Sequence, residues 1–277
     1  MSLNVALVAI GRRENLYARE FVEHYKNLGF ANVIIMDNNH EGEEHFEDVL
    51  QDYIDQGFVI IEDFRDQVKP QMRGYTQMYR KYGEKYDWIA FYDFDEFLIL
   101  QKHNDISEYL SLFPSDCQAI LINWLCMTDN NLVKYDTRPL MERFTEAMPL
   151  DRCVQYNFPD NCHVKSIIRG GLDVSFGGNP HTTDTPLIAY NASGVRCENR
   201  PWQLMDYRIA LLKHFTTKTI EEWMTRKMKV GTPDRDPSQF LPFYKDRFFK
   251  INEMTEDKMN YLKSIQAISE PSKPQTT

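Results

Sequence analysis

Four continuous apolar runs, separated by amphipathic segments, constrain the fold of this chain more than any other feature of its sequence. The runs cover residues 4–10, 32–37, 58–64 and 87–93. Each run is typical of a strand that is covered on both faces. The three segments between them carry apolar residues at helical spacing and end next to Gly29, Gly57 and Gly83. Strands and helices that alternate in this way predict a doubly wound, mostly parallel α/β sheet.

After residue 100 the pattern is less regular. Core strands are predicted over residues 117–127 and 209–215, and a T-x-x-E capping box from Thr219 to Glu222 predicts the start of a helix. Residues 128–200 are broken by Pro, Gly, Asn and Asp. This composition indicates long functional loops and a small β element, not a second independent domain.

The charge balance limits the kinds of partner. The 277-residue chain has a net charge of −9 and a pI near 5.3, which argues against a nucleic-acid backbone binder. An anionic small substrate would need local cations or a metal. The five cysteines form no C-x-x-C pair, so reduced thiols are expected. The first apolar run is too short for an export signal or a membrane span, and we expect a cytoplasmic protein with possible peripheral association at the inner face of the membrane.

The fourth run ends in three acids, in the stretch "DWIAFYDFDEFLIL". Asp93 and Asp95 share one face of a strand because side chains alternate with a period of two. Two carboxylates so close repel each other unless a cation lies between them. Mn²⁺ and Mg²⁺ prefer oxygen ligands and keep positions open for substrate phosphates. The stretch therefore predicts a metal site that faces a diphosphate, with Glu96 as a possible further ligand.

Other readings of these acids stay open. The sequence has no G-x-G-x-x-G after the first strand and no P-loop, which disfavours dinucleotide oxidoreductases and P-loop enzymes. A D-x-D also occurs in phosphohydrolases of the haloacid dehalogenase kind, but there it follows the first strand and leads to a threonine. A metal-dependent phosphohydrolase or nucleotidyltransferase is the alternative function. An inactive module that binds a nucleotide or a sugar is the second alternative.

An ordered set of short motifs resembles a known family. The motifs are "REN", "LYAREFVEHYKNLGF", "ANVIIMDNN", "RGY", "WIAFYDFDEF", "ERF", "KSIIRG" and "LLKHFTTKTIEEWMTRKMKVG". Together they resemble the GT-A-fold glycosyltransferases of the family-2 and family-92 type, above all a bacterial branch with D-x-D-E-F. The resemblance covers roughly residues 4–231. It implies an inverting hexosyltransferase that uses a nucleotide-diphosphate sugar, with a UDP-sugar expected, and Mn²⁺ or Mg²⁺. The expected acceptor is a glycan or a lipid-linked molecule in cell-surface polysaccharide synthesis.

The resemblance also implies a domain plan. Residues 1–235 would form the glycosyltransferase domain, with a nucleotide-binding half over 1–100 and an acceptor half over 101–235. Residues 236–268 would form a C-terminal helical extension. Residues 269–277 read as a disordered tail.

Site residues follow from the resemblance and from their places at strand and helix ends. The expected metal ligands are Asp93, Asp95 and His214. The expected donor-binding residues are Gly11, Arg12, Glu14, Asp37, Asn39, Gln71, Arg73, Asp93, Lys165, His181 and Lys218. A histidine that is hydrogen-bonded within the fold remains the alternative for His214, and an exposed lysine remains the alternative for Lys218.

An inverting reaction also needs a carboxylate to accept the proton of the acceptor hydroxyl. The sequence offers Asp129 in "MTDNN" and Glu142 in "MERF", and Asp129 is favoured. A plain turn is an equally good reading of Asp129. Trp124 and Trp202 are either faces on which a sugar stacks or parts of the core, and core packing is favoured for Trp124. The sequence departs from the family pattern at Arg12–Arg13 and Phe215, which leaves the contacts to the base of the donor open.

Overall fold

The computed structural model describes residues 2–149, 160–230 and 247–269. The tail predicted to be disordered lies outside the described residues, apart from Ser269, and so does the first part of the predicted C-terminal extension. Among the described residues, no helix combines the length and apolar character that a membrane crossing requires. The four cysteines in this part of the chain are free, and Cys153 lies outside it.

The first four strands form the parallel half of the sheet, in the order β3-β2-β1-β4. They are β1 (Val5–Gly11), β2 (Asn32–Asp37), β3 (Val59–Asp63) and β4 (Trp88–Asp93). Their registers place Gly11 opposite Asp37 and Ile10 opposite Asp93. The carboxyl ends of these strands therefore meet at one edge, where ligands bind in open α/β sheets.

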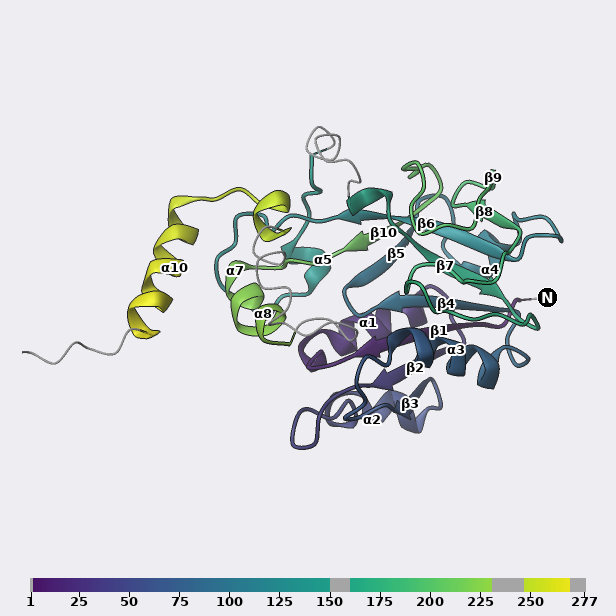
Figure 1. Cartoon of the computed structure of the whole chain (residues 1–277), viewed down its shortest axis with the longest axis horizontal. Coiled ribbons are helices and arrows are strands. Elements are labelled where there is room, and N and C mark those ends of the chain that lie inside the picture. Colours follow the sequence, from purple (N-terminus) through teal and green to yellow (C-terminus); the bar gives the residue numbers. More distant parts are fainter. Residues whose placement is uncertain (1, 150–159, 231–246, 270–277) are drawn as a thin grey trace, which may run out of the picture.

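Helices cover both faces of this half (Figure 1). They are α1 (Asn15–Asn27), α2 (Glu47–Asp55) and α3 (Gln71–Tyr82). Alternate residues of β1 separate the two layers, since Leu7 packs in the cluster that contains α1 and α2, whereas Val8 packs with α3. The sheet is thus doubly wound as predicted. Gly29 and Gly57 have positive φ as helix-ending glycines often do, whereas Gly83 keeps a helical φ of −56°.

The second half of the sheet is mixed, and the order continues β4-β7-β6-β10-β5. These strands are β7 (Val164–Arg169), β6 (Ala119–Cys126), β10 (Ala210–His214) and β5 (Glu96–Leu100), and the small strands β8 (Ala189–Asn191) and β9 (Arg196–Cys197) lie beside β6. β7 runs antiparallel to β4 and β6, and β10 runs antiparallel to β5. The predicted α/β class, with a mostly parallel sheet and a mixed extension, is confirmed.

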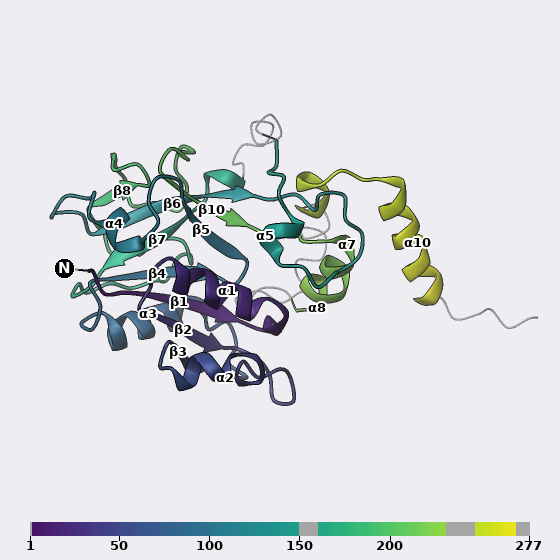
Figure 2. The same ribbon diagram turned by 180° about the vertical axis from the view of Figure 1, so that it is seen from behind.

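Short helices complete the second half: α4 (Ile106–Leu110), α5 (Leu140–Arg143), α7 (Ile220–Glu222) and α8 (Met228–Val230). The capping box at Thr219 is present as predicted. The helix that it opens contains a π-helical turn over Trp223–Lys227, which the sequence did not indicate. The last helix, α10 (Glu256–Ser269), extends away from the sheet at one end of the molecule (Figures 1 and 2).

Candidate active site

A cleft of about 510 Å³ opens at the carboxyl ends of β1, β4 and β10. This is the edge at which the predicted site residues were expected to meet. Of the predicted residues, the cleft is lined by Gly11, Arg12, Glu14, Gln71, Asp93, Asp95, His181 and His214. Most of the donor-binding candidates therefore lie in one cavity.

Asp95 and His214 lie next to each other in this cleft although 119 positions separate them. The antiparallel pairing of β10 with β5 puts His214 opposite Glu96, and His214 Nε2 lies 3.5 Å from Asp95 Oδ1. Asp95, Glu96 and His214 each offer one ligand atom, and these atoms all lie within 4.8 Å of one another. Two carboxylates and an imidazole are a suitable donor set for Mn²⁺.

The protonation states of Asp95 and His214 fit this donor set, whereas Glu96 has to lose a proton before it can bind a cation. Burial lowers the pKa of His214, which keeps the imidazole neutral and able to bind a metal. Burial alone would raise the pKa of Asp95, but Lys227 and His214 hold it well below its usual value. Burial raises the pKa of Glu96 well above its usual value. Among the described residues, Glu96 Oε1 and His214 Nδ1 are buried and have no hydrogen-bond partner, so the group has ligand capacity that the protein itself does not use.

Asp93 lies in a different network from the one predicted for it. Its Oδ1 accepts hydrogen bonds from Gln71 Nε2 at 2.9 Å and from Tyr75 OH at 3.1 Å. Its Oδ2 accepts from the buried Lys165 Nζ at 2.9 Å. The geometry groups Glu96, and not Asp93, with Asp95 and His214. Asp93 is instead held rigidly at the cleft wall by Gln71 and Lys165, two residues that were predicted to line the donor pocket.

Cations surround a smaller hollow next to the cleft. Arg12, Lys218, Arg226 and Lys227 line it, and Arg12, Glu14 and Lys227 also line the main cleft. Lys227 Nζ lies 3.6 Å from Asp95 Oδ2, and Lys218 Nζ lies 4.5 Å from the centre of the Tyr17 ring. This concentration of positive charge suits an anionic ligand despite the negative net charge of the chain.

Five predicted donor-binding residues lie outside the cleft lining. Lys165 binds Asp93, and Lys218 lines the adjacent hollow. The other three are Asp37, Asn39 and Arg73. Asp37 is buried, where it pairs with Arg65 at 2.6 Å and accepts hydrogen bonds from Asn39. Asn39 is fully buried and accepts from the backbone N–H of Arg13. Arg73 is exposed and donates to Gln67. Asp37 and Asn39 therefore stabilise the loops that follow β1 and β2 through these hydrogen bonds and this ion pair.

The two candidate general bases are also outside the cleft lining. Asp129 is buried and its Oδ2 lies 2.6 Å from Lys258 Nζ, which comes from α10. The next two residues, Asn130 and Asn131, have φ of 48° and 58°, so this segment forms the turn that was the alternative reading. Glu142 is exposed on α5. Neither residue lines the cleft that contains Asp95 and His214.

Several residues that line the cleft were not predicted from the sequence. They are Asp160, His163, Asn179, Trp223, Lys227 and Arg247. Arg226 and Lys227 follow the capping box at Thr219. Two basic residues in a helix that comes directly after a strand were the feature of the sequence that could have identified Lys227. Asp160 lies in a 3-10 turn and Arg247 in a short helical segment, and the local sequence around each gave no signal of a place in the cleft.

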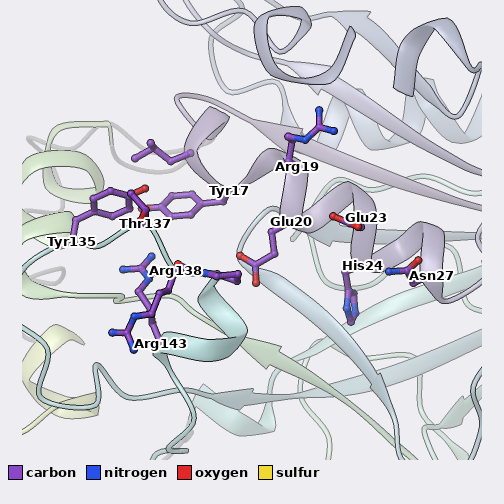
Figure 3. Close-up of a pocket in the computed structure, with 12 residues that line it drawn as sticks. Tyr17, Arg19, Glu20, Glu23, His24, Asn27, Tyr135, Thr137, Arg138 and Arg143 are labelled. Atoms are coloured by element: carbon purple, nitrogen blue, oxygen red, sulfur yellow. Dashed lines mark hydrogen bonds between the residues drawn. The ribbon is translucent and has the colours of Figure 1, made fainter. Parts of the chain in front are cut away.

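A separate hollow of about 440 Å³ lies between α1 and the segment around α5 (Figure 3). Figure 3 shows Glu20, Glu23 and His24 along α1, with Arg138 and Arg143 across from them. Glu20 accepts hydrogen bonds from the backbone N–H groups of Leu140 and Met141, and so satisfies the start of α5.

Tyr17 forms a wall that is shared by this hollow and the cationic hollow. Its hydroxyl donates to Glu222 at 2.6 Å, and Glu222 also accepts two hydrogen bonds from Arg143. The same carboxylate closes the capping box at Thr219, directly after Lys218. This buried network therefore fixes the backbone that carries the cations of the cleft.

Comparison with known proteins gives one match to a family model, that of glycosyltransferase family 92, over residues 9–228. No match was found among curated proteins. Among solved structures, S. aureus TarS 1–349 in complex with UDP shares 9% identity at a TM-score of 0.37, over 48% of this chain and 38% of that chain. A further structure of S. aureus TarS shares 8% identity at a TM-score of 0.40, over 91% of this chain and 44% of that chain. GalNAc-T7 with UDP, GalNAc and Mn²⁺ shares 14% identity at a TM-score of 0.34, over 46% and 24%.

The match to each of these solved structures spans less than half of the other protein, and likeness at these TM-scores carries no argument. The family model does, because it covers most of the chain, including the end of β1, all of β4, the Asp95 group and Lys227. The resemblance to a bacterial D-x-D-E-F branch is finer than this match and stays a prediction. With its doubly wound sheet, the chain belongs to glycosyltransferase family 92.

Proposed function

We propose that this glycosyltransferase moves a hexose from a nucleotide-diphosphate donor, a UDP-sugar, to a hydroxyl of a glycan or lipid-linked acceptor in cell-surface polysaccharide synthesis. One observation carries the proposal. The buried group Asp95, Glu96 and His214 lies in the same cleft as the cation Lys227, beside a hollow lined by further cations. A nucleotide-diphosphate sugar fits this arrangement, because its phosphate oxygens can bind both a metal ion and cationic side chains.

Asp95, His214 and Glu96 are the residues that would hold Mn²⁺ or Mg²⁺. When bound, the divalent ion would supply positive charge that stabilises the leaving nucleoside diphosphate. The donor set supports this assignment, because the imidazole of His214 is neutral. In addition, the buried atoms Glu96 Oε1 and His214 Nδ1 have no hydrogen-bond partner among the described residues. Removal of the carboxylate of Asp95 or Glu96 is expected to weaken metal binding more than substitution of a residue at the rim of the cleft.

The remaining residues bind and orient the donor. Lys227, Lys218 and Arg12 would contact the diphosphate, since charge-assisted hydrogen bonds to phosphate are stronger than neutral ones. Asp93 keeps part of its surface towards the cleft while Gln71 and Lys165 hold it in place. It would accept hydrogen bonds from the hydroxyls of the donor.

Inversion at the anomeric carbon is part of the proposal and requires a base for the acceptor proton. Asp129 and Glu142 do not line the cleft, whereas Asp160 does, at the start of a 3-10 turn (Asp160–Cys162). Its carboxylate is 30% exposed and lies 3.3 Å from Arg247 Nε. We therefore propose Asp160 as the base. A cytoplasmic location with peripheral membrane association remains a prediction.

Calorimetric titration tests the proposal. UDP and GDP are titrated with and without Mn²⁺ into the native protein, the variant Asp95→Ala and the control Asp52→Ala, whose carboxylate is half exposed and pairs with Arg19. We expect Mn²⁺-dependent micromolar binding of UDP that is lost in Asp95→Ala and retained in the control. Failure of the native protein to bind either nucleotide would contradict the proposal.

Product analysis separates the alternative functions. A glycosyltransferase releases nucleoside diphosphate from a nucleotide sugar, whereas a phosphohydrolase releases phosphate and a nucleotidyltransferase releases pyrophosphate. A module without catalytic activity would bind UDP and release no product from UDP-glucose, UDP-galactose or their N-acetyl derivatives. Release of UDP from any of these donors, absent in Asp95→Ala, is the expected result.

A further inference from the structure

We infer that Lys165 fills a second cation position in the acid cluster of the cleft, between Asp93 and Glu96, and that it thereby limits the cluster to one exchangeable metal ion. The inference deepens the proposed function and rests on it, because it concerns the site proposed to hold Mn²⁺ or Mg²⁺. The side chain of Lys165 is fully buried, so it acts through the two carboxylates and not by touching a ligand. Lys165 is therefore a positioning residue.

The contacts of the Lys165 ammonium are those of a bound cation. Lys165 Nζ lies 2.9 Å from Asp93 Oδ2 and 3.7 Å from Glu96 Oε2. The side chain of Glu96 is also fully buried, and that of Asp93 is 30% exposed. Two carboxylates that share a site repel each other unless a positive charge lies between them. Lys165 supplies that charge from within the protein.

Strand pairing brings Lys165 to this position. β7 runs antiparallel to β4 and sets Ile167 opposite Ala90. Lys165 comes shortly before Ile167 in β7, and Asp93 comes shortly after Ala90 in β4. The antiparallel pair therefore brings both residues to the same end of the two strands. A cation that is fixed in this way does not exchange with solvent, in contrast to a metal ion.

Lys165 also fixes the orientation of Glu96. Glu96 Oε2 faces the ammonium and accepts a hydrogen bond from the backbone N–H of Asp93 at 3.0 Å. The other oxygen, Glu96 Oε1, is buried and has no hydrogen-bond partner among the described residues. One oxygen of Glu96 is thus held by the protein, and the other is left for the ion that Asp95 and His214 would bind.

Both carboxylate oxygens of Asp93 are in use. Oδ1 accepts hydrogen bonds from Gln71 and Tyr75, and Oδ2 accepts one from Lys165. A metal ion that bound Asp93 would have to displace the ammonium and leave a buried charge without its nearest partner, which is strongly unfavourable. The acid cluster therefore keeps one position for a metal ion.

Removal of the ammonium should open the second position. Lys165→Met keeps a side chain of similar length but leaves Asp93 and Glu96 facing each other without a cation. Hard divalent ions bind such pairs of carboxylates. We expect Lys165→Met to bind two Mn²⁺ ions per chain where the native protein binds one. Lys165→Arg restores the charge and should bind one, and Lys165→Met/Asp93→Asn should lose the additional ion.

Electron paramagnetic resonance counts the bound ions, because the sharp signal of free Mn²⁺ disappears on binding. Mn²⁺ is titrated into the full native chain and into each variant, with and without UDP. The matched control is Lys258→Met, which removes another fully buried lysine, the partner of Asp129, at a place that does not line the cleft. Loss of a buried lysine lowers stability there too, but the number of bound ions should stay as in the native protein.

Thermal melting supplies a second measurement on the same variants. Mn²⁺ should raise the melting temperature of Lys165→Met more than that of the native protein, because an additional ion binds only to the folded state. Asp93→Asn tests the inference with Lys165 intact. It should weaken Mn²⁺ binding far less than Asp95→Asn, which is expected to cost at least about tenfold as the loss of a ligand.

Two results would overturn the inference. One is an equal number of Mn²⁺ ions in folded Lys165→Met and in the native protein, and the proposed function would then still stand. The other is a loss of Mn²⁺ affinity in Asp93→Asn that is as large as in Asp95→Asn. If neither the native protein nor Lys165→Met bound Mn²⁺, with or without UDP, the metal site of the proposed function would be contradicted as well.

Discussion

The buried ion pair of Arg143 and Glu222 allows a quantitative test of how the cleft is supported. The side chains are 1% and 3% exposed, and Arg143 Nη1 lies 2.9 Å from Glu222 Oε2. Glu222 also accepts hydrogen bonds from Tyr17 and Thr219. Substitution of Arg143 by methionine keeps much of the side-chain volume but leaves the carboxylate of Glu222 buried without its cation.

The expected cost follows from the burial of the pair. Removal of one partner of a buried ion pair destabilises a protein by about 3 to 5 kcal/mol, because the remaining charge is uncompensated. For a chain of this length, about 2 °C of melting temperature corresponds to each kcal/mol, so Arg143→Met should melt about 6 to 10 °C below the native protein. The double variant Arg143→Met/Glu222→Gln should recover part of this loss, since no buried charge is then left unpaired.

Urea unfolding monitored by circular dichroism measures these differences. The matched control is Arg19→Met, which breaks a pair with Asp52 whose side chains are 53% and 50% exposed. An exposed pair of this kind contributes about 0 to 1 kcal/mol. A loss in Arg143→Met no larger than in Arg19→Met would refute the argument. The argument would also be refuted if the double variant lost more stability than the two single substitutions lose when their effects are added.

The pH dependence of the free energy of unfolding tests independently whether the charge of Glu222 stabilises the folded protein. Burial would raise the pKa of Glu222, but hydrogen bonds from Arg143, Tyr17 and Thr219 hold it below the ordinary value of 4.5. A carboxylate with a lowered folded-state pKa stabilises the protein above its unfolded-state pKa, and this contribution is lost as the pH falls through the folded-state value. The difference in stability between the native protein and Arg143→Met should therefore be largest near pH 7 and shrink below pH 4.5.

Three further predictions concern the cleft and its supports. Lys258→Met leaves Asp129 buried without its cation and should lower the free energy of unfolding by about 3 to 5 kcal/mol in urea titration, whereas an unchanged midpoint would show that the pair contributes nothing. Gly11→Ala places a methyl group 2.7 Å from the ring of Phe94 and should cost about 1 to 3 kcal/mol and weaken UDP binding, and a native melting temperature would contradict this. Because burial lowers the pKa of His214, its imidazole should add no pH dependence to Mn²⁺ binding; in Glu96→Gln, which removes the neighbouring carboxyl of raised pKa, the Mn²⁺ affinity measured by calorimetry should stay constant between pH 7.5 and 6.5, and a tenfold fall in this variant would show that the imidazole is not neutral.

Local sequence patterns predicted the first half of the fold well. Continuous apolar runs gave β1, β2, β3 and β4, and the capping box gave the start of α7 at Thr219. These features depend on residues that are close in sequence, and local spacing reports them directly. The π-helical turn over Trp223–Lys227 could not be predicted in this way, because the spacing of apolar residues does not distinguish it from an ordinary helix.

The roles of buried charges depended on partners that are distant in sequence. Asp129 follows a core strand as a catalytic carboxylate would, yet Lys258 from α10 neutralises it. Asp37 stands at a strand end as a nucleotide-binding acid would, yet Arg65 pairs with it. A sequence pattern shows where a carboxylate lies along a strand, but not which cation reaches it.

The sequence by itself determined the doubly wound sheet and placed Asp93 and Asp95 at the carboxyl end of a central strand, because burial on both faces imposes a continuous apolar pattern. Only the tertiary structure decided which side chains surround these acids. Antiparallel pairing of β10 with β5 sets His214 opposite Glu96, and β7 beside β4 carries Lys165, which binds Asp93. Strand pairing over such separations is fixed by the packing of the whole sheet, and no local run of residues encodes it.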